Sequence, residues 1–143
     1  MNKICTTIEQ SRKLLEFVID INTADMCWSV DIPDSPTLLA YPITDCDNWE
    51  HKIPAWSLNA LLKFIKSEIY GETIYGDTIT YKVDFRKYKL TDDVDLYQIA
   101  YGSIKFDVDG QYSFKDMVNT GEKEDPIDAA FQMVVWLKEN NKI

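Results

Sequence analysis

A cysteine and the single histidine of the chain lie close together in the sequence, and their side chains have the clearest capacity for chemistry. Cys46 and His51 are five positions apart, with Asp45, Asp47 and Glu50 beside them. A thiolate, an imidazole and a carboxylate can hold zinc, or can act as nucleophile and base in hydrolysis. The set lacks a second ligand pair at a recognisable spacing, and no nucleophile-elbow motif accompanies it. We therefore predict no metal site, and a small metal-dependent hydrolase remains an alternative.

Other arrangements that resemble ligand sites are better explained as turns. Asp107, Asp109 and Gly110 begin like a calcium-binding loop, but the glycine comes two positions early and no glutamate closes the loop. The remaining glycines are scattered, so they do not form a loop that could cradle a phosphate. These patterns predict a protein that is not an enzyme and that uses no cofactor.

The tryptophans are the better indication of function. The chain has four of them, and tryptophan is enriched among the residues that anchor protein interfaces. Trp136 lies nearly opposite the apolar stripe of the last predicted helix, where it either packs under a neighbouring segment or marks a contact surface. Trp49 and His51 precede the second predicted helix, in a loop that can expose them. We predict that Trp49, His51 and Trp136 bind a partner protein.

The composition restricts the class of protein. The chain has 143 residues, of which 45% are hydrophobic, and a net charge of −9. So much apolar surface argues against disorder, and so acidic a chain argues against direct binding of nucleic acid. The acidity leaves one alternative, a nucleic-acid mimic that occupies a DNA- or RNA-binding protein. An apolar run of eighteen residues is missing, so we expect no membrane span. Three widely spaced cysteines favour reduced thiols and a cytoplasmic location.

Three segments have the periodicity and end signals of helices. Residues 6–18 place apolar side chains on one side, with Thr6 and Glu9 at the spacing of a capping box. A second helix follows Ser57, a good N-cap, and Trp56 stands where a hydrophobic staple would place it. The third covers residues 125–142 and begins with an aspartate cap and a proline.

Residues 72–115 read as an antiparallel sheet, whose registers follow from the turns. At Gly76-Asp77 the sequence suggests a two-residue loop that brings Ile74 opposite Ile79. At the next hairpin, a three-residue loop over 108–110 pairs Phe106 with Tyr112 and Ile104 with Phe114. These four side chains would then share one face, and we expect burial of that face to fix the register.

The order of these elements predicts the fold class. Shorter strands are expected over 27–32 and 37–43, before the main sheet. We predict a single α+β domain over residues 1–143. A twisted antiparallel sheet of about four to six strands should carry three packed helices, one N-terminal, one in the middle and one C-terminal.

Three segments of the chain resemble a family of small uncharacterised proteins encoded by gut Bacteroidales and by their prophages and mobile elements. The segments are Thr7-Ile8-Glu9-Gln10-Ser11 with Asn22-Thr23-Ala24-Asp25-Met26, Ile53-Pro54-Ala55-Trp56-Ser57-Leu58, and Asp125-Pro126-Ile127-Asp128-Ala129-Ala130. The layout is also similar to phage α-β-α sandwich domains. The resemblance implies one full-length domain and an accessory role, and it supplies no catalytic residues. Together with the tryptophans, it predicts a non-enzymatic protein-binding accessory factor of phage or mobile-element origin, with a homodimer as the alternative to a foreign partner.

Overall fold

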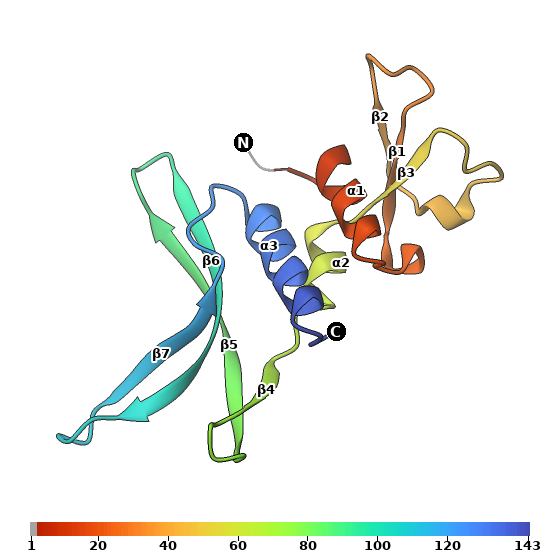
Figure 1. The fold of residues 1–143 in the computed structure, drawn as a ribbon. Helices are drawn as coiled ribbons and strands as arrows, with labels where there is room; N and C mark the ends of the chain where they lie inside the picture. The colour runs from red at the N-terminus through yellow and green to blue at the C-terminus, as the bar shows by residue number, and fades with distance from the viewer. Residues whose placement is uncertain (1–2) are drawn as a thin grey trace.

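The strands of the chain divide between two antiparallel sheets, with the helices packed between and beside them (Figure 1). A computed structural model describes residues 3–143. The helices are α1 (Ile8–Glu16), α2 (Leu58–Leu62) and α3 (Pro126–Glu139), and the strands are β1 (Met26–Ser29), β2 (Thr37–Leu39), β3 (Lys52–Ala55), β4 (Glu68–Glu72), β5 (Thr78–Lys89), β6 (Asp95–Phe106) and β7 (Tyr112–Asn119). The α+β class, the antiparallel pairing and the three helices are confirmed, but the strands form two sheets where one was expected.

The smaller sheet has the order β2-β1-β3, and α1 packs against β3. Its strands are short, and β2 ends at Leu39, before the Pro42 that was expected to sit inside a longer strand. The chain leaves β3 directly into α2, and Trp56 at this junction is completely buried. Because α2 begins there and packs on α3, it separates the smaller sheet from the larger one.

The larger sheet has the order β4-β5-β6-β7, and α3 lies on β6. Alternate side chains of β5 and β6 enter the core beside α3, among them Val83, Ile99 and Tyr101. The predicted start of α3 is confirmed, because the Asp125 carboxylate accepts a hydrogen bond from the Ile127 amide and Pro126 occupies the first turn. Among the described residues, no helix has the length and apolar character that a bilayer span requires.

The cap of the first helix differs from the prediction by one residue. Thr7, and not Thr6, is the N-cap, and its capping box closes with Gln10 instead of Glu9. Thr6 is buried, where its hydroxyl is hydrogen-bonded to Ser11 and accepts the Trp56 amide at 3.1 Å. Both threonines are suitable N-cap residues. Thr6 instead links α1 to the buried end of β3 through its hydrogen bonds.

The two hairpins that close the lower end of the larger sheet in Figure 1 have the same turn. In the β6–β7 hairpin, Ile104 pairs with Phe114 and Phe106 with Tyr112, as predicted, and Gly110 has a φ of 78°. The β4–β5 hairpin was predicted wrongly: Thr73 pairs with Asp77, and Gly76 takes the same left-handed position, with a φ of 81°.

The cause of the error in the β4–β5 hairpin lies in the side chain that precedes each loop. The Thr73 hydroxyl accepts the amides of Tyr75 and Asp77, as the Asp107 carboxylate accepts those of Asp109 and Gln111. These local hydrogen bonds favour the longer loop in both hairpins. Ile74 therefore lies exposed at a hairpin tip and does not face Ile79.

Candidate interaction surface

Trp49 and His51 lie in the loop that precedes β3, at the edge of the smaller sheet. The Trp49 side chain is 47% exposed, and His51 is exposed too. His51 has a φ of 58°, and its carbonyl accepts the Val30 amide at 2.8 Å, which fastens the loop to the end of β1. Its imidazole is 3.5 Å from the Glu50 carboxylate. The pair is therefore available for contact with another molecule.

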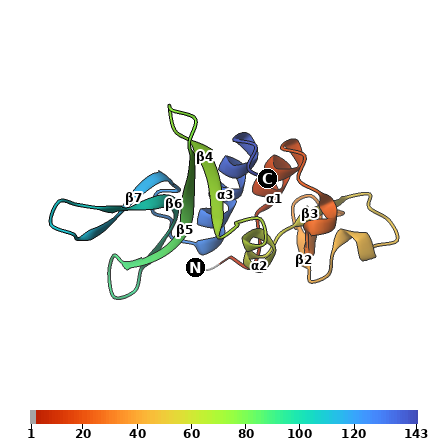
Figure 2. The same ribbon diagram turned by 90° about the horizontal axis from the view of Figure 1, so that it is seen from below.

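Trp136 is placed differently. It is half-buried in α3 and packs against the main core, which is the packing alternative that its position on the helix left open. Figures 1 and 2 show α3 and the loop before β3 in different parts of the molecule. Trp49 and His51 thus share one exposed loop, and the structure does not bring Trp136 to them.

The cysteine of the predicted chemical cluster faces the smaller sheet. Cys46 lies near Cys27, and burial, together with this neighbouring thiol, raises the pKa of Cys27 to about 11. Cys27, the thiol beside Cys46, therefore stays protonated at neutral pH and is a poor nucleophile. Between residues 3 and 143, no three cysteine, histidine or acidic side chains are arranged to hold a metal ion.

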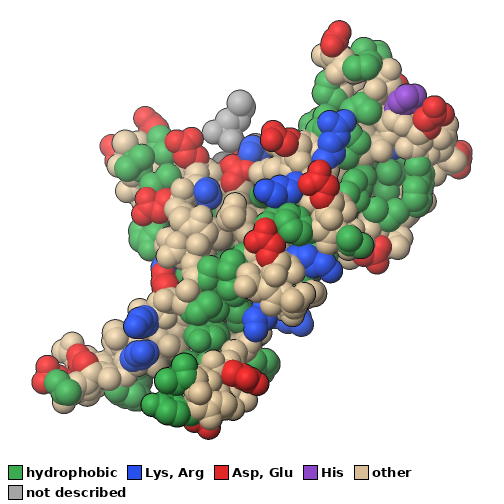
Figure 3. All heavy atoms as spheres, viewed as in Figure 1, with side chains coloured by type: hydrophobic (Ala, Val, Ile, Leu, Met, Phe, Trp, Pro, Cys, Tyr) green, Lys and Arg blue, Asp and Glu red, His purple; other side chains and the backbone are tan. Residues whose placement is uncertain are grey.

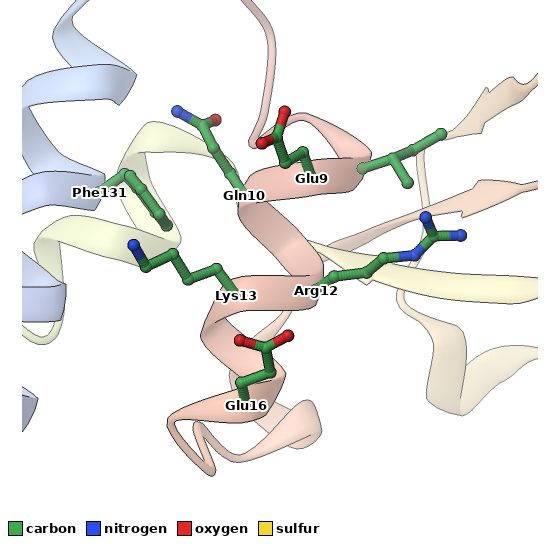
Figure 4. A pocket seen from close by; sticks show the side chains of 7 residues that line it. Glu9, Gln10, Arg12, Lys13, Glu16 and Phe131 are labelled. Atoms are coloured by element: carbon green, nitrogen blue, oxygen red, sulfur yellow. The ribbon is translucent and has the colours of Figure 1, made fainter.

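A groove of about 690 Å³ lies between α1 and α3. Figure 4 shows Gln10 and Lys13 of α1 directed toward Phe131 of α3, while Arg12 is directed away from it. The helix carries charges of both signs along this groove. Such a mixture gives neither an apolar anchor nor a field of one sign, so the groove has little capacity to select a ligand.

A more distinctive surface lies at the far end of β6 and β7. The two strands continue past the rest of the sheet as a two-stranded arm, residues 103–115, which projects at the lower left of Figure 1. One side of the arm, which we call the aromatic face, consists of Ile104, Phe106, Tyr112 and Phe114. The first three side chains are 55%, 65% and 70% exposed, and the rings of Phe106 and Tyr112 are 4.1 Å apart.

The aromatic face points away from the core because the hydrophobic pattern of β6 changes phase at Gly102. Before this glycine, Ile99 and Tyr101 point toward α3 and are buried. After it, Ile104 and Phe106 occupy the alternate positions, so their side chains lie on the opposite face of the same strand. The register with β7 also shifts between Tyr101 and Gly102.

The base of the arm is held by an ion-pair cluster on this same face. The Arg86 guanidinium donates to Asp116 at 2.6 and 2.9 Å and to Asp84 at 2.7 Å. These hydrogen bonds from Arg86 lower the pKa of Asp116. Arg86 also lies 5.4 Å from the centre of the Phe114 ring, and that ring covers Gly102 so closely that a side chain there would collide with it. The cluster therefore sets the position of Phe114, the innermost member of the aromatic face.

The other side of the arm, the lysine face, carries Ser103, Lys105, Ser113 and Lys115. Figure 3 shows basic side chains midway along the arm and acidic ones at its tip. Elsewhere on the face in that view, acidic and basic side chains are interspersed, so it lacks the continuous acidic surface that a nucleic-acid mimic would need.

Comparison with known proteins adds no relative: no protein-family model, curated protein or solved structure matches the chain. The aromatic face was missed because the four residues were expected to be buried. The signal that could have revealed it is the phase change at Gly102, since apolar residues at 97, 99 and 101 and then at 104 and 106 cannot all face one helix.

Proposed function

We propose that this protein is a non-enzymatic binding module that holds a partner protein on the aromatic face of the arm. The observation that carries this proposal is the exposure of Ile104, Phe106 and Tyr112 on the side of β6 and β7 that α3 does not cover. Contiguous exposed aromatic side chains are typical of interaction sites, because covering them with another apolar surface is favourable. The resemblance to proteins of phages and mobile elements supports an accessory role in the cytoplasm.

The arm is suited to binding because it is anchored at one end only. Its base is held by Arg86 and by the ring of Phe114 over Gly102, whereas its outer strands pair only with each other. A two-stranded hairpin has little stability of its own in water. Contact with a partner would cover its apolar side chains and stabilise it.

The test compares two double variants of the full chain. Phe106→Ser with Tyr112→Ser removes the two outer rings of the aromatic face, and Ile74→Ser with Tyr75→Ser changes the tip of the other hairpin, which is even more exposed. Each tagged protein is used to capture proteins from a host-cell lysate, and any captured partner is then titrated in purified form.

We expect the wild-type chain and the β4–β5 control to hold the same partner, and the arm variant to lose at least about tenfold in affinity. Equal affinity for the arm variant and the wild-type chain would refute the proposal. A loss confined to the control variant would move the binding site to the β4–β5 tip.

A further inference from the structure

The inner edge of the arm is an unpaired strand edge. β5 pairs with β6 only as far as Lys82 and Gly102, and beyond this point β6 pairs with β7 alone. The Asp107 amide donates to the Gln111 carbonyl at 2.9 Å. Asp107 and Gln111 therefore form a hydrogen-bonded pair. Since hydrogen-bonded and non-hydrogen-bonded pairs alternate in an antiparallel ladder, Lys105, two residues away, also turns its backbone groups toward β7. Ile104 and Phe106 therefore direct their N–H and C=O groups toward the free edge.

This edge borders a cleft between two diverging hairpins. Figures 1 and 2 show the β4–β5 hairpin and the arm separating from the common base of the sheet. A cleft of about 220 Å³ lies in the fork. It is lined by Ile79 and Tyr81 of β5, by Ser103, Lys105 and Lys115 of the arm, and by Asp116 and Met117 at its base. An extended segment that enters the fork would meet backbone groups and a pocket together.

The cleft is basic although the chain as a whole is acidic. The net charge is −9, but Lys105 and Lys115 are the only charged side chains in the paired strands of the arm, 103–106 and 112–115. Asp116, at the base, is paired with Arg86, which it shares with Asp84, and Asp107 caps the turn at the tip. A ligand in the cleft therefore meets two lysines and one carboxylate, that of Asp116, which is already held by Arg86. This balance favours a negatively charged side chain.

We propose that the occupant is an extended segment of the partner protein, which adds as a strand to the inner edge of β6 and alternates apolar with acidic residues. The inference rests on the proposed function and specifies the partner's chemistry. In an added strand, residues beside Ile104 and Phe106 extend the aromatic face and must be apolar. The intervening residues point into the cleft, where carboxylates meet Lys105 and Lys115.

A second copy of the chain fits this site less well. The inner edge of a second copy lies inside its own fork and cannot enter the fork of the first. Two copies could pair through the outer edges of β7, but this pairing would leave the cleft empty. The apolar area that the aromatic face can bury is also small. An aromatic side chain buries roughly 150–250 Å², so the aromatic face offers a few hundred Å², against roughly 800 Å² per partner in stable interfaces. An added strand supplies the missing contribution through main-chain hydrogen bonds.

The probe is a short, end-capped peptide in which valine and glutamate alternate. Two controls accompany it: a peptide in which valine alternates with lysine, and one in which the same valines and glutamates form two blocks. Each is titrated into the isotope-labelled full chain while the backbone amide resonances and their hydrogen exchange are followed. We expect the alternating acidic peptide to bind most tightly and to slow exchange at the Ile104 and Phe106 amides.

Charge-reversed variants test the role of the cleft. Lys105→Glu with Lys115→Glu should weaken binding of the acidic peptide by about tenfold, whereas Lys87→Glu with Lys89→Glu, at the other end of β5, should leave it unchanged. Both pairs are exposed. Because Lys87 and Lys89 lie 3.5 and 3.8 Å from the Asp95 carboxylate, the amide spectrum of each variant is first compared with that of the wild-type chain to show that it folds. Equal binding of all three peptides, or exchange protection at Tyr112 and Phe114 on the outer edge, would overturn the proposal. Resonances that shift with protein concentration alone would assign the edge to a second copy and would also overturn it.

The two proposals can fail separately. If a captured partner depends on Phe106 and Tyr112 but not on the two lysines, and no peptide binds, the binding module stands and strand addition falls. If the partner is indifferent to both sets of changes, both proposals fall.

Discussion

The two halves of β6 show how one strand can serve a core and a surface. Its first half places Ile99 and Tyr101 under α3, where they are 4% and 0% exposed. Its second half carries an equally apolar pair, Ile104 and Phe106, which are more than half exposed. The side chains are similar in kind and spacing, so the difference comes from the face on which they lie and from whether a helix covers that face.

The alternation of apolar and polar residues along a strand shows which side chains share a face, but it does not show whether another element covers that face. α3 contacts β6 in its first half, where the core lies, and the strand extends beyond. At Gly102 the apolar residues move to the other side, and the Phe114 ring occupies the place that a side chain at 102 would take. In β6 the apolar residues switch to the other face at the point where coverage by α3 ends. The switch therefore removes no side chain from the core, and it leaves an apolar surface exposed.

The largest expected effect lies in the covered half of the strand. Ile99→Ala should lower the free energy of unfolding by about 2–5 kcal/mol, because it removes buried methyl groups and leaves a cavity under α3. Urea denaturation of the variant and of the wild-type chain measures the difference. A loss below about 1 kcal/mol would mean that α3 packs loosely on β6 and that the two halves differ less than their burial indicates.

The sequence predicted what local rules govern. The start of α3 at Asp125, the cap at Ser57 and the loop that ends at Gly110 were all correct, since each depends on residues within one turn. The same rules failed where two residues compete for one role, as with Thr6 and Thr7, because the choice depends on the distant Trp56 amide.

The surface could not be predicted because burial is a property of the whole fold. The register of Phe106 and Tyr112 was correct, but the reason given for it, burial of their common face, was wrong: turn chemistry at Asp107 and Gly110 fixes the register instead. Coverage depends on where α3 crosses the sheet, which no short segment specifies. Of the predicted partner-binding residues, Trp49 and His51 are exposed and Trp136 is half-buried, and their role stays a prediction.

The second-largest effect is expected at the boundary between the halves. Gly102→Ala would place a methyl group 2.3 Å from the Lys115 carbonyl oxygen and 2.6 Å from the Phe114 ring. The backbone oxygen cannot move freely, so we expect a loss of about 1–3 kcal/mol in unfolding free energy and a displaced arm. Denaturation measures the loss, and amide shifts confined to residues 103–115 would show the displacement. Gly121→Ala is the matched control, since a methyl group there meets no atom within 4 Å and its cost comes from its positive φ alone.

A smaller effect, which depends on pH, is expected from the ion pair that anchors the arm. Arg86 lowers the pKa of Asp116, so the carboxylate stabilises the fold above its ordinary pKa. That contribution is lost as the pH falls through the lowered pKa. Asp116→Asn should therefore cost about 1 kcal/mol at neutral pH, and the difference from wild type should shrink below about pH 4. Urea denaturation over a pH series measures this, with Asp109→Asn at the exposed tip as the control. A difference that does not change with pH would show that the charge of Asp116 does not hold the arm.

The smallest effect is expected from the isoleucine in the exposed half of β6. Ile104→Ala should change the free energy of unfolding by less than about 1 kcal/mol, because its side chain is largely in water before and after unfolding. The same denaturation experiment used for Ile99→Ala measures it, so the two isoleucines report directly on coverage. A loss as large as that for Ile99→Ala would mean that something covers the aromatic face in the free protein, and a second copy would then be its occupant. A negligible loss accompanied by weaker partner binding would separate the two halves by function as well as by burial, since an apolar side chain that contributes little to the fold would then contribute to recognition.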